Sequence, residues 1–162
     1  MSRVVALASL LLLPAVSYAE EGLAVLRFGG GAAAPLEDRT VAGALGLSAD
    51  LCFSARFGLV FDTHFLARPG YRNLGLGLGL KAVPFEWFWR RIYVHLVPEL
   101  QLSFGPPEDR ADFGVRALVG YEELLFWGTG LFLETFAALP LTTERPLDAV
   151  AVGATAGLFI EF

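Results

Sequence analysis

The sequence has little cysteine and little positive charge, and both shortages limit what it can do. Among its 162 residues there is one cysteine, Cys52. One cysteine cannot form a disulfide within the chain, and thiolate zinc motifs need at least a pair. Acidic residues outnumber basic ones by 17 to 12, which gives a formal charge of −5. Because phosphate binding needs clustered lysine and arginine, this balance argues against nucleic acid as a partner.

Long apolar runs are also missing from most of the chain. After residue 20 no uninterrupted apolar stretch reaches the roughly 18 residues of a transmembrane helix, which disfavours a helical membrane bundle. At the N-terminus, Arg3 precedes an apolar run over residues 4–13, and small residues occupy the minus-three and minus-one positions before a cut after Ala19. This pattern predicts a signal peptide over residues 1–19, removed after export through the Sec pathway, and a mature domain over residues 20–162. The alternative is an uncleaved anchor, for which the run is short.

In place of long runs, the chain has apolar residues that alternate with a period of two. Over residues 74–80 every second residue is leucine and the others are glycine. A helix would spread these leucines around its circumference and lose roughly 1 kcal/mol at each glycine, whereas a strand places them on one face. The same alternation recurs over residues 45–53, 59–66, 92–104 and 150–162, and more weakly over 23–30, 113–122 and 125–138. The sequence therefore predicts about eight strands of roughly 9–14 residues, long enough to cross a bilayer when tilted.

The two faces of these strands differ in polarity. One face is almost entirely apolar, while the other mixes glycine with serine, histidine and charged residues. A soluble barrel has the opposite arrangement, with its apolar face inside. A soluble sandwich could also show one apolar face, so the export signal and the aromatic clusters decide between the two. Near the predicted turns, Trp87, Trp89 and Trp127 are expected at the membrane interface.

The predicted connections fall into two groups. Those on the periplasmic side are short or aromatic, and they lie at residues 54–56, 84–90 and 122–123. Those on the outer side carry proline, glycine and charge, and they lie at residues 32–39, 68–73, 105–112 and 140–148.

The C-terminal end resembles a known assembly signal. Gly157, Leu158, Ile160 and Phe162 give a glycine, apolar residues at alternate positions and a terminal aromatic residue. Outer-membrane barrels carry such a β-signal, although Thr155 stands where a lysine or glutamine is usual. Together with the leader and the strand number, the whole mature chain resembles the OmpA/OmpX-type eight-stranded barrels of Gram-negative bacteria.

This resemblance implies an all-β fold, an antiparallel up-and-down transmembrane barrel in the outer membrane. It implies insertion by the barrel-assembly machinery with periplasmic chaperones, and contact with outer-membrane lipid and lipopolysaccharide. We expect a monomer. Such barrels serve many functions, so the resemblance predicts fold and location better than it predicts activity.

Charged residues on the inward face predict an ion-pair network inside the barrel. The interior of an eight-stranded barrel is just wide enough for side chains, and an unpaired charge there costs several kcal/mol. Counting from the short turns places Arg27 opposite Asp50, Asp62 opposite Lys81, and Lys81 beside His95, in a lower layer. The same counting gives a higher layer of Glu99, Arg116 and Glu134, and places Glu161 at the base near Arg27.

Three functions remain open on the sequence. The ion pairs favour a non-enzymatic barrel with a closed lumen, which would serve envelope structure or surface interaction. Inward glycines at 75, 77 and 79 leave space for a narrow porin-like pore for protons or small solutes. A lipid A-modifying enzyme is least favoured, because His64 and His95 lack a serine two residues away and should point inward. No cofactor or metal site is predicted, since the histidines and carboxylates lack ligand spacing.

Overall fold

A computed structural model describes residues 24–36, 40–105, 109–142 and 150–162. The predicted signal peptide and its cleavage site lie outside these residues. No helix in the described part of the chain is long and apolar enough to cross a membrane. The described residues form eight strands of 11 to 17 residues.

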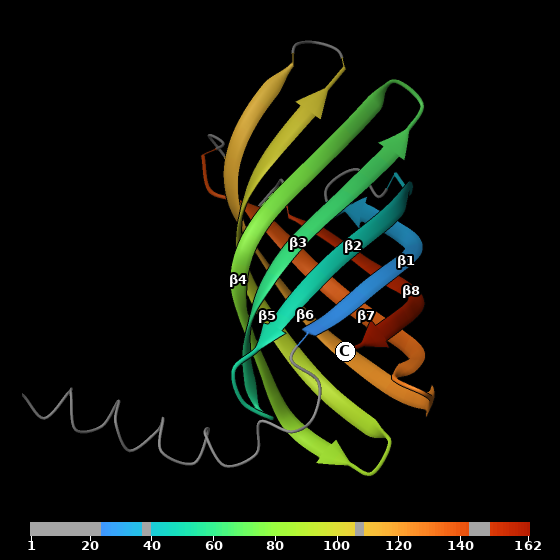
Figure 1. Ribbon diagram of the computed structural model, residues 1–162. Helices are drawn as coiled ribbons and strands as arrows, with labels where there is room; N and C mark the ends of the chain where they lie inside the picture. Colours follow the sequence, from blue (N-terminus) through green and yellow to red (C-terminus); the bar gives the residue numbers. More distant parts are fainter. Residues whose placement is uncertain (1–23, 37–39, 106–108, 143–149) are drawn as a thin grey trace, which may run out of the picture.

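The eight strands close into one antiparallel barrel, in which each strand pairs with its neighbour in sequence and the last pairs with the first (Figure 1). This confirms the predicted fold class and strand number. The strands are β1 (Ala24–Pro35), β2 (Ala42–Cys52), β3 (Phe57–Arg68), β4 (Tyr71–Trp87), β5 (Arg90–Phe104), β6 (Arg110–Phe126), β7 (Thr129–Pro140) and β8 (Ala151–Glu161).

The alternation in the sequence corresponds to the two faces of the barrel wall. On β4, Leu78 and Leu80 point outward and are 62% and 59% exposed, whereas Gly77 on the same strand faces the lumen. Exposed leucine, phenylalanine and valine side chains cover the outside of all eight strands. An apolar surface of this extent would associate in water, but it suits a lipid environment.

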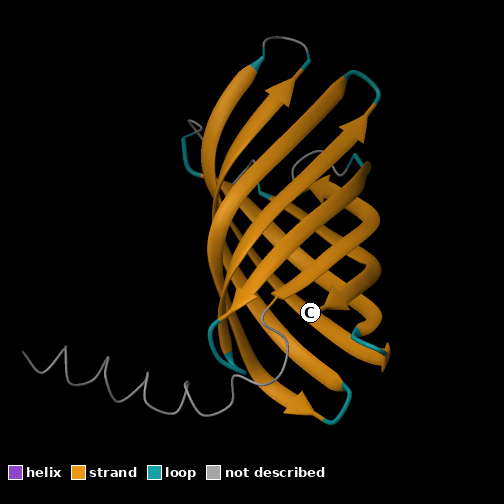
Figure 2. Ribbon diagram, in the orientation of Figure 1, coloured by secondary structure: helices purple, strands orange, loops and turns teal. Residues whose placement is uncertain are grey.

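The two ends of the barrel differ in their connections (Figure 2). We call the end at which β1 begins and β8 ends the lower end. There the backbone N–H of Phe162 donates to the carbonyl of Ala24 at 2.9 Å, which closes β8 against the start of β1. The turns β2–β3, β4–β5 and β6–β7 also lie at this end, and the other four connections lie at the upper end.

Of the turns predicted at the lower end, one is displaced and one is shorter than predicted. Residues 122–123 lie inside β6, which continues to Phe126, and the turn is formed by Trp127 and Gly128 with φ of 51° and 72°. Strand β4 likewise continues to Trp87, so only residues 88–89 make the turn to β5. At the upper end, the connection predicted at residues 68–73 is a turn of two residues, with Gly70 at φ 75°.

Aromatic side chains fill much of the lumen. Phe132 and Phe159 pack with Val25 near the lower end, and Phe136 packs with Tyr93 in a second apolar cluster. Inward glycines make room for these rings, because a Cβ atom at position 120 would collide with the ring of Tyr93. Continued alternation along β6 would also turn Phe126 inward, but a register shift between Leu124 and Phe126 interrupts it, and Phe126 is 65% exposed at the lower end.

Candidate functional site: the charged lumen

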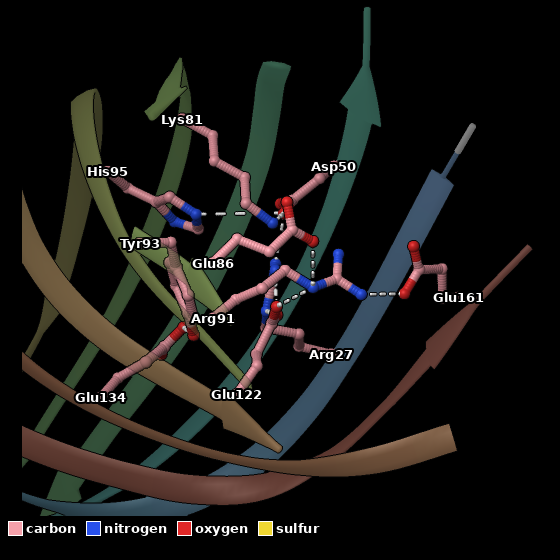
Figure 3. A network of polar contacts seen from close by, with 10 residues as sticks. All are labelled: Arg27, Asp50, Lys81, Glu86, Arg91, Tyr93, His95, Glu122, Glu134 and Glu161. Carbon is pink, nitrogen blue, oxygen red and sulfur yellow. Dashed lines mark hydrogen bonds and ion pairs between the residues drawn. The ribbon is translucent and has the colours of Figure 1, made fainter. Parts of the chain in front are cut away.

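A buried group of charged residues crosses the lower half of the lumen, and we call it the lower cluster (Figure 3). Arg27, on β1, donates from Nη1 to Asp50 Oδ2 and from Nε to Glu122 Oε1, both at 2.6 Å. Lys81, on β4, donates to the same Asp50 oxygen at 2.7 Å. All four side chains are almost completely buried. One carboxylate therefore bridges two cations that come from different strands.

Tyr93, on β5, lies against both cations of the lower cluster. Its ring centroid is 4.6 Å from Arg27 Cζ and 5.0 Å from Lys81 Nζ, distances at which the face of the ring attracts a cation. The hydroxyl of Tyr93 donates to Glu134 Oε1 at 2.6 Å. Thr155 donates to the other Glu134 oxygen at 3.1 Å. The charges are thus held from several sides by hydrogen bonds and by an aromatic ring.

Arg91 extends the lower cluster to the mouth of the barrel at the lower end. It forms an ion pair with Glu161 on β8. Its Nε atom lies 3.9 Å from Glu122 Oε2 and 3.8 Å from Glu86 Oε1. These contacts join β4, β5, β6 and β8 across the lumen (Figure 3). The lower end is therefore crossed by a continuous set of ion pairs.

A second charged group, the upper cluster, lies nearer the upper end of the barrel. Arg116, on β6, forms an ion pair with Asp62 on β3, and its Nε atom lies 3.6 Å from Glu99 Oε2. His64 Nδ1 lies 3.6 Å from the same Glu99 oxygen. Gln101 donates to the other Glu99 oxygen at 2.5 Å. Two carboxylates here share one guanidinium, an imidazole and an amide.

The structure brings together some of the predicted pairs and separates others. Arg27 does bind Asp50, and Lys81 is directly opposite His95 in the β4–β5 register. The predicted pair of Asp62 and Lys81 is wrong. In the β3–β4 register Asp62 is opposite Gly77, so Lys81 lies four residues away along β4 and reaches Asp50 instead. Asp62 consequently belongs to the upper cluster.

The remaining residues of the predicted network also lie in the lumen, but their partners differ from those predicted by counting residues from the turns. Glu161 is at the base as expected, but its ion-pair partner is Arg91 and not Arg27. Glu134 does not join Glu99 and Arg116, and among the described residues its partners are Tyr93 and Thr155. His95 Nε2 lies 3.9 Å from Asp50 Oδ2 and its ring lies 4.8 Å from that of Tyr93.

Several residues of the two clusters were not in the predicted network, among them His64, Arg91, Tyr93 and Glu122. The sequence did indicate that each of them faces inward, because each lies an even number of residues from a predicted inward residue on the same strand. Glu122 was overlooked because it was placed in a turn.

Several buried polar atoms of the clusters have no hydrogen-bond partner within the described residues. They include Asp50 Oδ1, both ring nitrogens of His95 and Glu122 Oε2. Buried polar atoms need a partner, and water is small enough to supply one in a polar cavity. One cavity of about 20 Å³ lies between Asp62, Arg116 and Glu134, and another of about 30 Å³ lies beside Lys81 and Arg91. In the described part of the chain, no group of three histidine, cysteine or acidic residues could hold a metal ion.

The other predicted residues are on the outer surface or at the end of the last strand. Trp87, Trp89 and Trp127 are exposed at the lower end, at the β4–β5 and β6–β7 turns. On β8, Leu158 and Ile160 point outward and are 62% and 44% exposed. Gly157 faces the other way, packed against the β1 backbone, and Phe162 follows the end of the strand. This arrangement is compatible with an interfacial role for the tryptophans and with a C-terminal assembly signal.

The structure is similar to those of several known small barrels. Neisserial surface protein A matches with a TM-score of 0.70 and 11% identity, over 86% of this chain and 96% of that one. The N-terminal β-barrel domain of Pseudomonas aeruginosa OprF matches with 0.67 and 9%, over 88% and 100%. The outer membrane protein OprG from Pseudomonas aeruginosa matches with 0.63 and 13%, over 87% and 96%. No protein-family model matches the sequence, and no curated protein matches it. The chain therefore has the fold of the small eight-stranded outer-membrane barrels, as its resemblance to that group predicted.

Proposed function

We propose that this protein is a non-enzymatic barrel of the Gram-negative outer membrane, with a lumen closed by ion pairs and a role in envelope structure or surface interaction. The apolar outer wall and polar interior support insertion in lipid, and the barrels with similar folds support the outer membrane. The lower end, with the start of β1, the end of β8 and the short aromatic turns, would face the periplasm. The upper end would face outward.

The lower cluster is the observation that supports a closed lumen. Arg27, Asp50 and Lys81 meet at 2.6–2.7 Å in the lower half of the lumen, with Tyr93 against both cations. Moving Asp50 away from its partners would leave the ammonium of Lys81 buried without a carboxylate partner among the described residues, at a cost of several kcal/mol. The cluster therefore resists the rearrangement that a passing ion would need.

Conductance in planar bilayers tests this proposal. The purified, folded barrel is compared with a variant in which Arg27 and Glu122 are both replaced by serine, so that the pair is removed without leaving one charge behind. We expect a silent native barrel and conductance in the variant. A stable and reproducible channel from the native barrel would refute the closed lumen.

A narrow pore is the second candidate, and the unpartnered buried atoms of the two clusters favour it. Asp50 Oδ1, the His95 ring nitrogens and Glu122 Oε2 are buried in the lumen without a hydrogen-bond partner among the described residues. Water-sized cavities lie beside Arg27 and Lys81, the two cations that contact Asp50. A chain of water molecules through these positions would carry protons without opening the barrel to larger ions. Proton uptake into vesicles that contain the barrel, measured with an internal pH dye under a potassium diffusion potential, separates this function from a closed lumen.

A lipid-modifying enzyme has the least support. Such an enzyme needs its catalytic groups where lipid can reach them, whereas His64 and His95 are 5% and 1% exposed and lie inside the barrel. Unchanged masses of lipid A in cells that express the protein would agree with this, and a mass shift would contradict it.

A further inference from the structure

A groove of about 420 Å³ lies on the outer wall of the barrel near its lower end, and we call it the outer groove. Its volume is within the range of about 300–1,000 Å³ that is usual for ligand pockets. The outward side chains that line it come from the β2–β3 turn and from β3, β4 and β5. They are those of Phe53, Phe57, Leu80, Ala82, Val94 and Leu96.

The outer groove exists because a small side chain stands between large ones. In the register of the sheet, Ala82 on β4 is opposite Phe57 on β3 and Val94 on β5. The next outward position on β4 is Leu80, which is 59% exposed and is opposite Leu96 on β5. The methyl group of Ala82 therefore leaves a gap in an otherwise continuous apolar wall.

This gap opens toward the outside of the barrel and not toward the lumen. Phe57 and Leu96 both point outward and are 52% and 55% exposed. Atoms that line an unfilled gap lose the dispersion contacts that a neighbouring atom would supply. A hydrocarbon chain restores these contacts, whereas water against an apolar lining is unfavourable. The chemistry of the lining therefore favours an acyl chain as the occupant.

The shape of the lower end places the outer groove close to the membrane surface. Strand β3 begins at Phe57, opposite Ala82, whereas β4 continues for five more residues to Trp87. The β4–β5 hairpin consequently projects beyond the β2–β3 turn (Figure 1). Trp87 and Trp89 are exposed on this hairpin, and tryptophan rings are enriched at the level of the lipid headgroups. A chain in the groove would run from this level into the hydrocarbon.

A cation stands at the lower edge of the outer groove. Arg56 directly precedes Phe57 in the β2–β3 turn, and its side chain is exposed. The turn holds its backbone in place, because the Arg56 carbonyl accepts a hydrogen bond from the N–H of Val83 at 2.8 Å. Ser54 Oγ also accepts from the N–H of Phe57 at 3.0 Å. A guanidinium binds phosphate through charge-assisted hydrogen bonds, and a basic residue near the membrane surface is attracted to anionic headgroups.

From these features, we infer that the outer groove binds one acyl chain of an anionic phospholipid, with the headgroup phosphate at Arg56. The chain would lie over Ala82, between Phe57 and Val94, and would extend toward Leu80. The assignment to the periplasmic leaflet rests on the proposed orientation of the barrel. The groove itself does not depend on whether the lumen is closed.

Native mass spectrometry of the full, folded barrel tests this inference, with dioleoylphosphatidylglycerol as the probe. Dioleoylglycerol has the same chains without the phosphate, and glycerol phosphate has the phosphate without the chains. Lipid A represents the other leaflet. We expect saturable binding of the phospholipid, weaker binding of dioleoylglycerol and lipid A, and no binding of glycerol phosphate.

Two matched pairs of variants locate the bound lipid. Ala82→Phe fills the outer groove, whereas Ala137→Phe adds the same ring to the outer face of β7, away from the groove. Arg56→Gln removes the cation at the groove, whereas Arg72→Gln removes one at the upper end of β4. We expect Ala82→Phe to abolish saturable binding and Arg56→Gln to weaken it about fivefold. Both controls should bind as the native barrel does.

Heat-modifiable gel mobility shows which variants are folded, and Ala82→Leu fills part of the same space if Ala82→Phe does not fold. Loss of binding in the folded Ala82 variant, with retention in Ala137→Phe, supports the site. Equal binding of dioleoylglycerol and the phospholipid, tighter binding of lipid A, or unchanged binding in Arg56→Gln overturns it. A barrel that is silent in planar bilayers but lacks this selective binding would overturn the outer groove and leave the proposed function standing.

Discussion

The ion pair between Lys81 and Asp50 gives the sharpest test of the lumen. Asp50 Oδ2 is the one carboxylate oxygen within ion-pair distance of Lys81 among the described residues, whereas Arg27 also has Glu122. Replacing Asp50 with asparagine keeps the shape of the side chain and removes its charge. The ammonium of Lys81 is then buried against the ring of Tyr93 with no carboxylate partner among the described residues. Lys81→Met in the same chain removes that buried charge.

The expected size of the effect follows from the geometry. At 2.7 Å and an effective dielectric constant of about 20, the attraction between the two charges is roughly 6 kcal/mol before the cost of removing both from water. Breaking a buried pair on one side costs about 3–5 kcal/mol, and less where water enters. We therefore expect Asp50→Asn to lower the free energy of unfolding by about 3 kcal/mol or more, and the double variant to recover about 1–3 kcal/mol of that loss.

Urea titration of the barrel in lipid vesicles, read by heat-modifiable mobility, measures the four free energies of this double-mutant cycle. Asp62→Asn with Lys81→Met is the control cycle, because Asp62 pairs with Arg116 and not with Lys81. The control should be additive to within about 0.5 kcal/mol. Zero coupling between Asp50 and Lys81 with two stable single variants would mean that the lumen is wet. Stronger coupling in the control cycle would mean that the β3–β4 register is wrong.

Three further outcomes are expected from the same structure. Leu78→Arg on the outer wall should destabilise the barrel by about 2–4 kcal/mol near mid-bilayer, and a negligible cost in vesicles would contradict a lipid-facing β4. Gly77→Ser should also be destabilising, because its Cβ would collide with Val97 and a β5 carbonyl, whereas Gly46→Ser should be mild, since nothing lies within 4 Å of a Cβ there. The same urea titration compares the two variants, and equal losses of unfolding free energy would argue against this packing. Phe162→Asp should leave the protein in the periplasm, as measured by membrane fractionation, and normal outer-membrane yield would argue against the proposed assembly signal.

The number of strands, and the face of the barrel wall to which each side chain points, were predictable from the sequence because they depend on one local rule. Side chains alternate across a strand, so the leucines over residues 74–80 had to share a face whatever their neighbours were. The charges on the opposite face then had to be inside, because lipid excludes them. This rule alone placed Arg27, Asp50 and Lys81 in the lumen. The same rule puts Tyr93 and Glu122 on the inward face of β5 and β6, where the structure has them buried.

Only the tertiary structure decided which charges meet. Pairing across the lumen depends on register and strand tilt, and these depend on every turn and register shift around the closed barrel. Strand β6 runs beyond the predicted turn, and β4 pairs with β3 four residues away from the predicted alignment of Lys81 with Asp62. Long side chains then reach past the adjacent strand, as Lys81 does to Asp50 and Arg27 does to Glu122. Alternation is a property of each strand and can be read along the chain, whereas the ion pairs of the lumen exist only after eight strands have closed on one another.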